Sequence, residues 1–109
     1  RFPTPDGKAR LVSVSPPPEP VPALDDFPLR LNTGRYRDQW HTMTRTGLSP
    51  RLSQHRREPL LEVHPDDAAA AGLEDGGLAE VATAQGRSAY RVMVTADQQP
   101  GQVFVPMHF

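Results

Sequence analysis

The placement of proline most limits what this chain can fold into. Eight of its thirteen prolines lie within the first 28 residues, and residues 15–22 read S-P-P-P-E-P-V-P. Proline fixes φ and lacks a backbone N–H, so such a run is extended and cannot join the middle of a β-sheet. We therefore expect residues 1–28 to form a proline-rich linker or arm, and residues 29–109 to form the folded domain.

The composition indicates a small, polar, globular domain. The chain has 109 residues, 37% of them hydrophobic, and a net charge of -1, which gives no reason to expect a nucleic-acid or membrane partner. It contains no cysteine, which excludes disulfides, iron–sulfur clusters and thiolate metal ligands within this chain. No motif has catalytic or metal-ligand spacing, so we predict neither a catalytic residue nor a metal site in it.

Positive charge is nevertheless concentrated in one region. Residues 30–57 contain seven arginines and a single acid, Asp38, which gives a formal charge of 7 - 1 = +6. The guanidinium group is a planar fork that suits phosphates, carboxylates and the edges of heteroaromatic rings. This basic region is therefore the first candidate for a binding site.

Most of the remaining pattern predicts β-structure. Alternating apolar residues predict short strands at residues 9–14, 29–32, 60–64, 78–83, 88–95 and 102–106. Turn-forming residues fill positions 5–7, 73–77, 84–87 and 97–101, and Gly86 occupies a hairpin position that favours positive φ.

One helix is clearly predicted, at residues 65–72. Pro65 is the first helical residue and two acids follow it in the first turn. Alanines fill the middle of the helix, and His64 is in the N-cap position. Residues 48–57 are expected to form an irregular segment or one short helix. Short strands with closely spaced turns and no repeated βαβ pattern favour a mainly β fold, a small closed or nearly closed barrel.

The stretch that stands out has the sequence L-N-T-G-R-Y-R-D-Q-W-H-T-M-T-R at residues 31–45. It begins as a strand and should break at Asn32, Thr33 and Gly34 to present backbone N–H groups to an anion. Trp40 and His41 offer flat surfaces to a heteroaromatic ligand. The alternative is a surface loop whose arginines serve only solubility.

This stretch resembles the opening of the C-terminal dinucleotide-binding domain of molybdopterin oxidoreductases, and most of all that of assimilatory nitrate reductases, in which a T-G-R-x-x-x-x-W-H-T-x-T-R pattern recurs. The resemblance continues through R-L-S at residues 51–53, E-P at 58–59 and H-P at 64–65 to V-F-V-P-M-H at 103–108. It implies a double-psi β-barrel, with a further stretch after Phe109 completing it.

The resemblance also implies what the domain binds. Molybdopterin guanine dinucleotide carries the molybdenum, while any iron–sulfur cluster belongs to other domains of the parent enzyme. The residues assigned to the cofactor are Thr33, Gly34, Arg35, Gln39, Trp40, His41, Thr42, Thr44, Arg45 and His108. Tyr36 departs from the pattern, in which small apolar residues are common at this position.

The implied parent enzyme reduces nitrate to nitrite, and the isolated 109-residue chain should be inactive. A formate dehydrogenase domain, or a small barrel subunit of another molybdenum or tungsten enzyme such as formylmethanofuran dehydrogenase, is an alternative. A polyanion-binding module is a more remote one, since only Tyr36 and Trp40 supply aromatic rings to the basic region.

The partners expected are the cofactor and other domains of the parent chain, in the cytoplasm or, as an alternative, the periplasm. Residues 103–105 are a strongly β-forming strand close to the last residue, and we expect its edge to lack a neighbour. Unpaired edges recruit strands. Residues 9–14 of the arm are therefore expected either to fold back onto this edge or to let the chain self-associate weakly.

Overall fold

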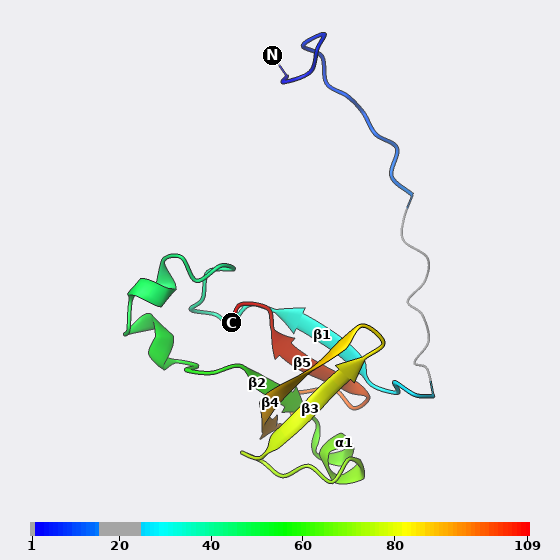
Figure 1. Cartoon of the computed structure of the whole chain (residues 1–109), viewed down its shortest axis with the longest axis vertical. Coiled ribbons are helices and arrows are strands. Elements are labelled where there is room, and N and C mark those ends of the chain that lie inside the picture. Colours follow the sequence, from blue (N-terminus) through cyan, green and yellow to red (C-terminus); the bar gives the residue numbers. More distant parts are fainter. Residues whose placement is uncertain (1, 16–24) are drawn as a thin grey trace.

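The computed structural model describes residues 2–15 and 25–109. Residues 25–109 contain one curled sheet with a helix and a long loop, and residues 2–15 belong to an arm apart from the sheet (Figure 1). The strands are β1 (Arg30–Gly34), β2 (Leu60–Val63), β3 (Leu78–Thr83), β4 (Gly86–Val94) and β5 (Gln102–Pro106). Their order across the sheet is β1-β5-β2-β4-β3. β1 is parallel to β5 and β2 to β4, whereas β2–β5 and β3–β4 are antiparallel.

Alternation along the strands gives the sheet an apolar face. In β5, Val103 and Val105 are buried on this face, and Leu61 and Val63 of β2 share it. Seven buried residues make up the core: Leu61, Val63, Ala68, Ala79, Val92, Val103 and Val105. Since no buried side chain in this cluster is larger than leucine, strand register rather than large aromatic anchors determines how the core packs.

Helix α1 (Pro65–Ala70) packs on the core through Ala68, its one buried residue. As predicted, Pro65 begins it and His64 caps it, with Nδ1 accepting a hydrogen bond from the Asp66 N–H at 3.2 Å. Asp67 in its first turn accepts a 2.7 Å bond from the Gly101 N–H, which ties the helix to the turn before β5.

The arginine loop, residues 35–59, joins the end of β1 to the start of β2 and forms a separate lobe beside the C-terminus (Figure 1). It contains two 3-10 turns, η1 (Thr46–Leu48) and η2 (Leu52–Gln54). The expected irregular segment is therefore present, as two short turns and not as a single helix.

The expected fold class is confirmed: the domain is mainly β, with one short helix and 3-10 turns, and its sheet curls into an open half-barrel. Among the described residues β1 and β3 form the two edges of the sheet. We had expected the strand at residues 103–105 to have an unpaired edge, and this is wrong. β5 pairs with β1 on one side and with β2 on the other.

Three local predictions also need correction. Residues 9–14 form no strand; Leu11 is 95% exposed, and the arm leads away from the sheet (Figure 1). β1 does not break at Asn32 but continues to Gly34, because β5 offers partners up to Pro106. Gly86 has no positive φ and is instead the first residue of β4.

Candidate functional site

Two exposed arginines flank one exposed tryptophan in the arginine loop. The guanidinium carbons of Arg35 and Arg45 lie 5.9 and 5.8 Å from the centroid of the Trp40 ring, within cation–π range. The His41 ring is 5.2 Å from that of Trp40 and tilted by 35°. Trp40 remains 45% exposed, so part of this flat, positively charged surface is open to a ligand.

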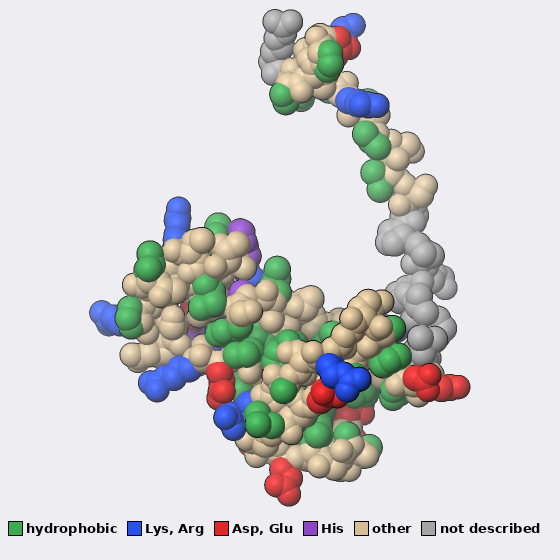
Figure 2. Space-filling view, in the orientation of Figure 1, with side chains coloured by type: hydrophobic (Ala, Val, Ile, Leu, Met, Phe, Trp, Pro, Cys, Tyr) green, Lys and Arg blue, Asp and Glu red, His purple; other side chains and the backbone are tan. Residues whose placement is uncertain are grey.

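Charge in the loop is unevenly available. Arg37 makes two hydrogen bonds to the Asp38 carboxylate, at 2.9 and 3.0 Å, and this pairing holds the pKa of Asp38 below its usual range. Arg35 and Arg45 have no such ion pair among the described residues. Figure 2 shows basic side chains projecting from the lobe that the loop forms. Of the loop arginines without an ion pair among the described residues, Arg35 and Arg45 lie next to Trp40, and together with its ring they suit a planar anion.

Polar side chains inside the loop stabilise it. Gln39 and Thr46 are 4% and 7% exposed, and the Thr46 hydroxyl donates to the Gln39 side-chain oxygen. The Ser53 hydroxyl donates to the Thr46 carbonyl at 3.1 Å. Gln39 thus points into the loop and satisfies a buried hydroxyl, which leaves the exposed surface to its neighbour Trp40.

Thr42 and Thr44 are exposed and hydrogen-bonded to each other through their hydroxyls at 3.1 Å. Between them Met43 has a φ of 54°, a left-handed conformation that non-glycine residues seldom adopt. This turn reverses the chain so that Arg45 returns to the ring of Trp40.

Thr33 and Gly34 lie in β1 and not in a loop, opposite Val105 and Pro106 of β5. A Cβ on Gly34 would lie 3.2 Å from Cε2 of the Phe104 ring, so any larger residue here would press against that ring. The backbone N–H groups of the expected anion loop are therefore part of a strand, and the loop proper begins at Arg35.

His108 follows β5 and is buried, only 4% exposed, against the start of the arginine loop. Its Nε2 accepts a 2.8 Å hydrogen bond from the Tyr36 N–H, and the two rings lie edge to face with centroids 5.4 Å apart. Met107 and Phe109 on either side are 56% and 55% exposed. The sequence singled out His108 and marked Tyr36 as a departure from the motif, but it did not connect the two, because no local pattern links residues so far apart.

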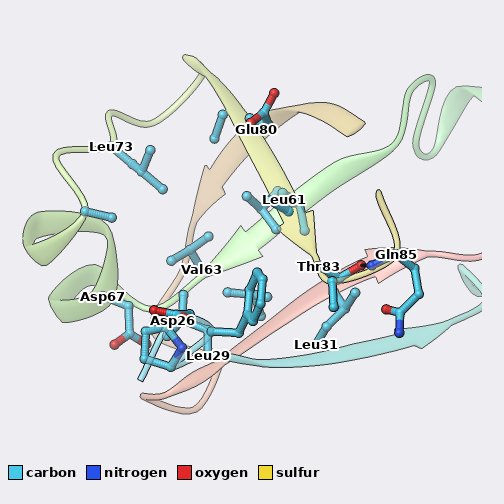
Figure 3. A pocket seen from close by; sticks show the side chains of 18 residues that line it. Asp26, Leu29, Leu31, Leu61, Val63, Asp67, Leu73, Glu80, Thr83 and Gln85 are labelled. Atoms are coloured by element: carbon cyan, nitrogen blue, oxygen red, sulfur yellow. Dashed lines mark hydrogen bonds between the residues drawn. The ribbon is translucent and has the colours of Figure 1, made fainter. Parts of the chain in front are cut away.

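A cavity of about 610 Å³ lies elsewhere, on the apolar face of the sheet beside α1 (Figure 3). Its lining includes Leu29, Leu31, Leu61 and Val63, and its charged groups are acids such as Asp67. None of the ten predicted site residues lines it, and its apolar and acidic surface does not suit an anion. The groups that suit an anion with a planar ring, Arg35, Trp40 and Arg45, lie in the arginine loop instead.

The described residues contain no group of three or more His, Cys, Asp or Glu side chains that could hold a metal ion. Within residues 2–15 and 25–109, no helix is long and apolar enough to cross a membrane.

Comparison with known protein families identifies the family of this domain. The model of the family described as "Molydopterin dinucleotide binding domain" matches residues 29–109. The chain belongs to this family. The match begins where the proline-rich segment ends and includes the arginine loop, β5 and His108, so this molybdopterin dinucleotide-binding domain contains every residue of the candidate site.

Similar proteins include a nitrate reductase of Klebsiella oxytoca, 50% identical over 95% of this chain and 12% of the relative. The assimilatory nitrate reductase catalytic subunit of Bacillus subtilis is 35% identical over 99% of this chain and 16% of its own length. An F420-dependent formate dehydrogenase subunit alpha of Methanocaldococcus jannaschii is 37% identical over 77% and 12%. The chain thus spans a small part of each of these relatives.

A solved structure has the same fold. Acetylene hydratase from Pelobacter acetylenicus superposes with a TM-score of 0.66 at 24% identity, over 74% of this chain and 11% of the other. The family match and this fold agree with the resemblance stated from the sequence.

The residues present fit the cofactor that the family implies. A molybdopterin dinucleotide has two heteroaromatic ends joined by a pyrophosphate, so it needs flat surfaces and positive charge close together. Trp40 with Arg35 and Arg45 provides both on one exposed surface.

Proposed function

We propose that this molybdopterin dinucleotide-binding domain holds molybdopterin guanine dinucleotide within a larger nitrate reductase. The observation that carries the proposal is the exposed Trp40 ring flanked by the guanidinium groups of Arg35 and Arg45, which have no ion-pair partner in the part of the chain that the structure describes. The similarity to nitrate reductases over nearly the whole chain supports nitrate as the substrate of the parent enzyme. When bound, the cofactor supplies the molybdenum at which nitrate is reduced to nitrite.

The residues of this chain bind and orient and perform no chemistry of their own. Arg35 and Arg45 would donate charge-assisted hydrogen bonds to the phosphates, and Trp40 and His41 would stack on or border a ring. Thr42 and Thr44 offer exposed hydroxyls, and Thr33 extends the polar surface along β1. Gln39, Gly34 and His108 would contribute through the packing that fixes the loop.

The test uses the full-length polypeptide that carries this domain. We expect the double variant Arg35→Ala/Arg45→Ala, and separately Trp40→Ala, to lose molybdenum and the guanine nucleotide released by acid. Each charge-assisted bond lost should lower the affinity roughly tenfold. The matched control is Arg87→Ala, which removes an exposed arginine on β4, paired with Glu80 at 3.4 Å, outside the arginine loop. Normal molybdenum and nucleotide content in both site variants would overturn the proposal.

Substrate assays separate nitrate reduction from its main alternative. The loaded polypeptide should reduce nitrate with a reduced viologen dye as the electron donor. Oxidation of formate in place of nitrate reduction would assign the parent enzyme to the formate dehydrogenases, to which the chain is also similar.

A further inference from the structure

The arginine loop is tied at its first residues to the far end of the sequence. The Tyr36 N–H donates to Nε2 of His108, 72 residues away, at 2.8 Å. Both side chains are buried, at 8% and 4% exposure, and their rings are in edge-to-face contact. Phe104 and Phe109 complete the cluster, with ring centroids 6.3 and 6.1 Å from that of Tyr36.

The same tyrosine also holds the other end of the loop. Its hydroxyl accepts a 3.1 Å hydrogen bond from the N–H of Leu60, the first residue of β2. Burial is the main reason that the pKa of Tyr36 lies above its usual value, so the phenol stays neutral. Through its backbone N–H, its ring and its hydroxyl, Tyr36 therefore connects the first turn of the loop, the start of β2 and the segment after β5.

Burying His108 leaves one of its ring nitrogens without a hydrogen bond, which a residue chosen for packing alone would avoid. Because Nε2 accepts a hydrogen bond, the neutral ring carries its proton on Nδ1. That atom is buried and has no hydrogen-bond partner among the described residues. An unsatisfied buried donor is unfavourable, and an apolar side chain of similar size would avoid it. What the histidine provides in return is an acceptor for the Tyr36 N–H.

We propose that His108 and Tyr36 form a clamp that fixes the arginine loop and so positions Arg35, Trp40 and Arg45. Both are positioning residues, since they are buried and act through the loop. The clamp itself follows from the contacts above, whereas its effect on cofactor binding rests on the function proposed for Trp40 and the two arginines. The segment after β5 thereby controls the order of a loop that begins after β1.

The arginines of the loop allow a direct test by limited proteolysis. In the full-length polypeptide, trypsin cleavage after Arg45 and Arg51 reports how often the loop opens. His108→Leu fills the space without an acceptor and should speed both cleavages about tenfold, the effect of losing one buried hydrogen bond. His108→Gln keeps an acceptor oxygen and should restore slow cleavage. Tyr36→Phe, which keeps the ring and loses the bond to Leu60, should also cleave faster.

Cleavage after Arg87 on β4 is measured in the same digest and should stay unchanged, because it reports unfolding of the sheet. If His108→Leu accelerates it too, that variant unfolds the domain, and Tyr36→Phe then decides the matter. The clamp is overturned if a folded His108→Leu variant is cleaved in the loop at the wild-type rate. If His108→Leu unfolds the domain, loop cleavage of Tyr36→Phe at the wild-type rate overturns it.

Molybdenum and nucleotide content then test the coupling to the cofactor. We expect His108→Leu to lose cofactor and His108→Gln to retain it. If His108→Leu opens the loop yet keeps its cofactor while Arg35→Ala/Arg45→Ala loses it, the positioning role is wrong and the proposed function stands. If the double arginine variant and Trp40→Ala also keep their cofactor, the proposed function is wrong, and the proteolysis result still decides the clamp.

Discussion

At the scale of single residues, Glu62 shows how the sheet imposes a cost on a charged group. It lies in β2 between the buried residues Leu61 and Val63, and its register partners are Phe104 and Met93. Burial raises its pKa above the usual value; Arg56 opposes this shift and Asp97 adds to it. The folded state therefore binds the Glu62 proton more tightly than the unfolded state does.

From this shift we predict that Glu62→Gln stabilises the domain at neutral pH. The free energy of unfolding of the wild type falls as pH rises from the unfolded pKa through the raised folded pKa, and it stays lower above it. The amide has no charge to desolvate, so the advantage of the variant should vanish below the usual glutamate range. Thermal melts across this pH range measure it. Glu74→Gln, in an exposed turn, is the control, and an equal gain there would contradict the explanation.

Gly34 gives a second residue-scale prediction, because the structure assigns it a packing role. A Cβ there would lie 3.2 Å from the Phe104 ring, which itself contacts Tyr36. We expect Gly34→Ala to lower the free energy of unfolding by roughly 1 kcal/mol through overpacking. Gly86→Ala is the control, since a Cβ there would meet no atom within 4 Å. Chemical denaturation measures both, and equal stability of the two variants would count against the prediction.

At the scale of elements, α1 is attached to the sheet by one carboxylate. Asp67 accepts the 2.7 Å bond from the Gly101 N–H, and Gly101 has a φ of 77° in the turn that leads into β5. The neighbouring Asp66 lies in the same helical turn, but its side chain is 84% exposed. Two adjacent acids that both favour a helix N-terminus thus differ in whether they also link two elements.

We predict that Asp67→Ala lowers the free energy of unfolding by about 1 kcal/mol more than Asp66→Ala does. Both changes remove one negative charge from the first turn of α1. The Asp66 carboxylate also lies 3.6 Å from Nδ1 of His64, so the excess loss in Asp67→Ala is a lower bound on the contribution of the bond to Gly101. Urea denaturation of the two variants measures it. If the two losses are equal, the carboxylate acts only on the helix and not on the turn.

At the scale of the whole molecule, the sheet is open and its strands are unequally paired. β5, β2 and β4 each have two neighbours, whereas β1 and β3 have one each among the described residues. Among the described residues, arm residues 2–15 hydrogen-bond only to one another, through the turn at Thr4, Asp6 and Gly7.

Amide hydrogen exchange should follow this pairing. We expect the slowest exchange in β5 and β2, faster exchange in β1 and β3, and exchange near the rate of an unfolded chain in residues 9–14. Exchange of the 109-residue chain, measured by mass spectrometry with peptide resolution, gives this order. If β1 and β5 are equally protected in a monomeric sample, another part of the chain covers the β1 edge. If equal protection appears only at high protein concentration, the chain self-associates through that edge.

The sequence by itself determined the local elements and the chemistry on offer. Strand periodicity, the Pro65 and His64 signals and the positions of turns placed the strands of the sheet and α1 within a few residues, because short-range sterics and capping decide them. Arginine, tryptophan and glycine at residues 34–45 pointed to an anionic, planar ligand, and the resemblance named the family. Two local predictions were wrong. Gly86 does not take a positive φ because it pairs as the first residue of β4, and residues 9–14 form no strand because they have no partner strand among the described residues.

Only the tertiary structure decided which residues meet. The extension of β1 to Gly34 depends on β5, some seventy residues later, and the strand expected at the edge proved to be internal for the same reason. The roles of Tyr36, Gln39 and His108 inside the fold depend on contacts between distant segments. Such contacts form when burial brings remote donors and acceptors together, and no local pattern encodes them.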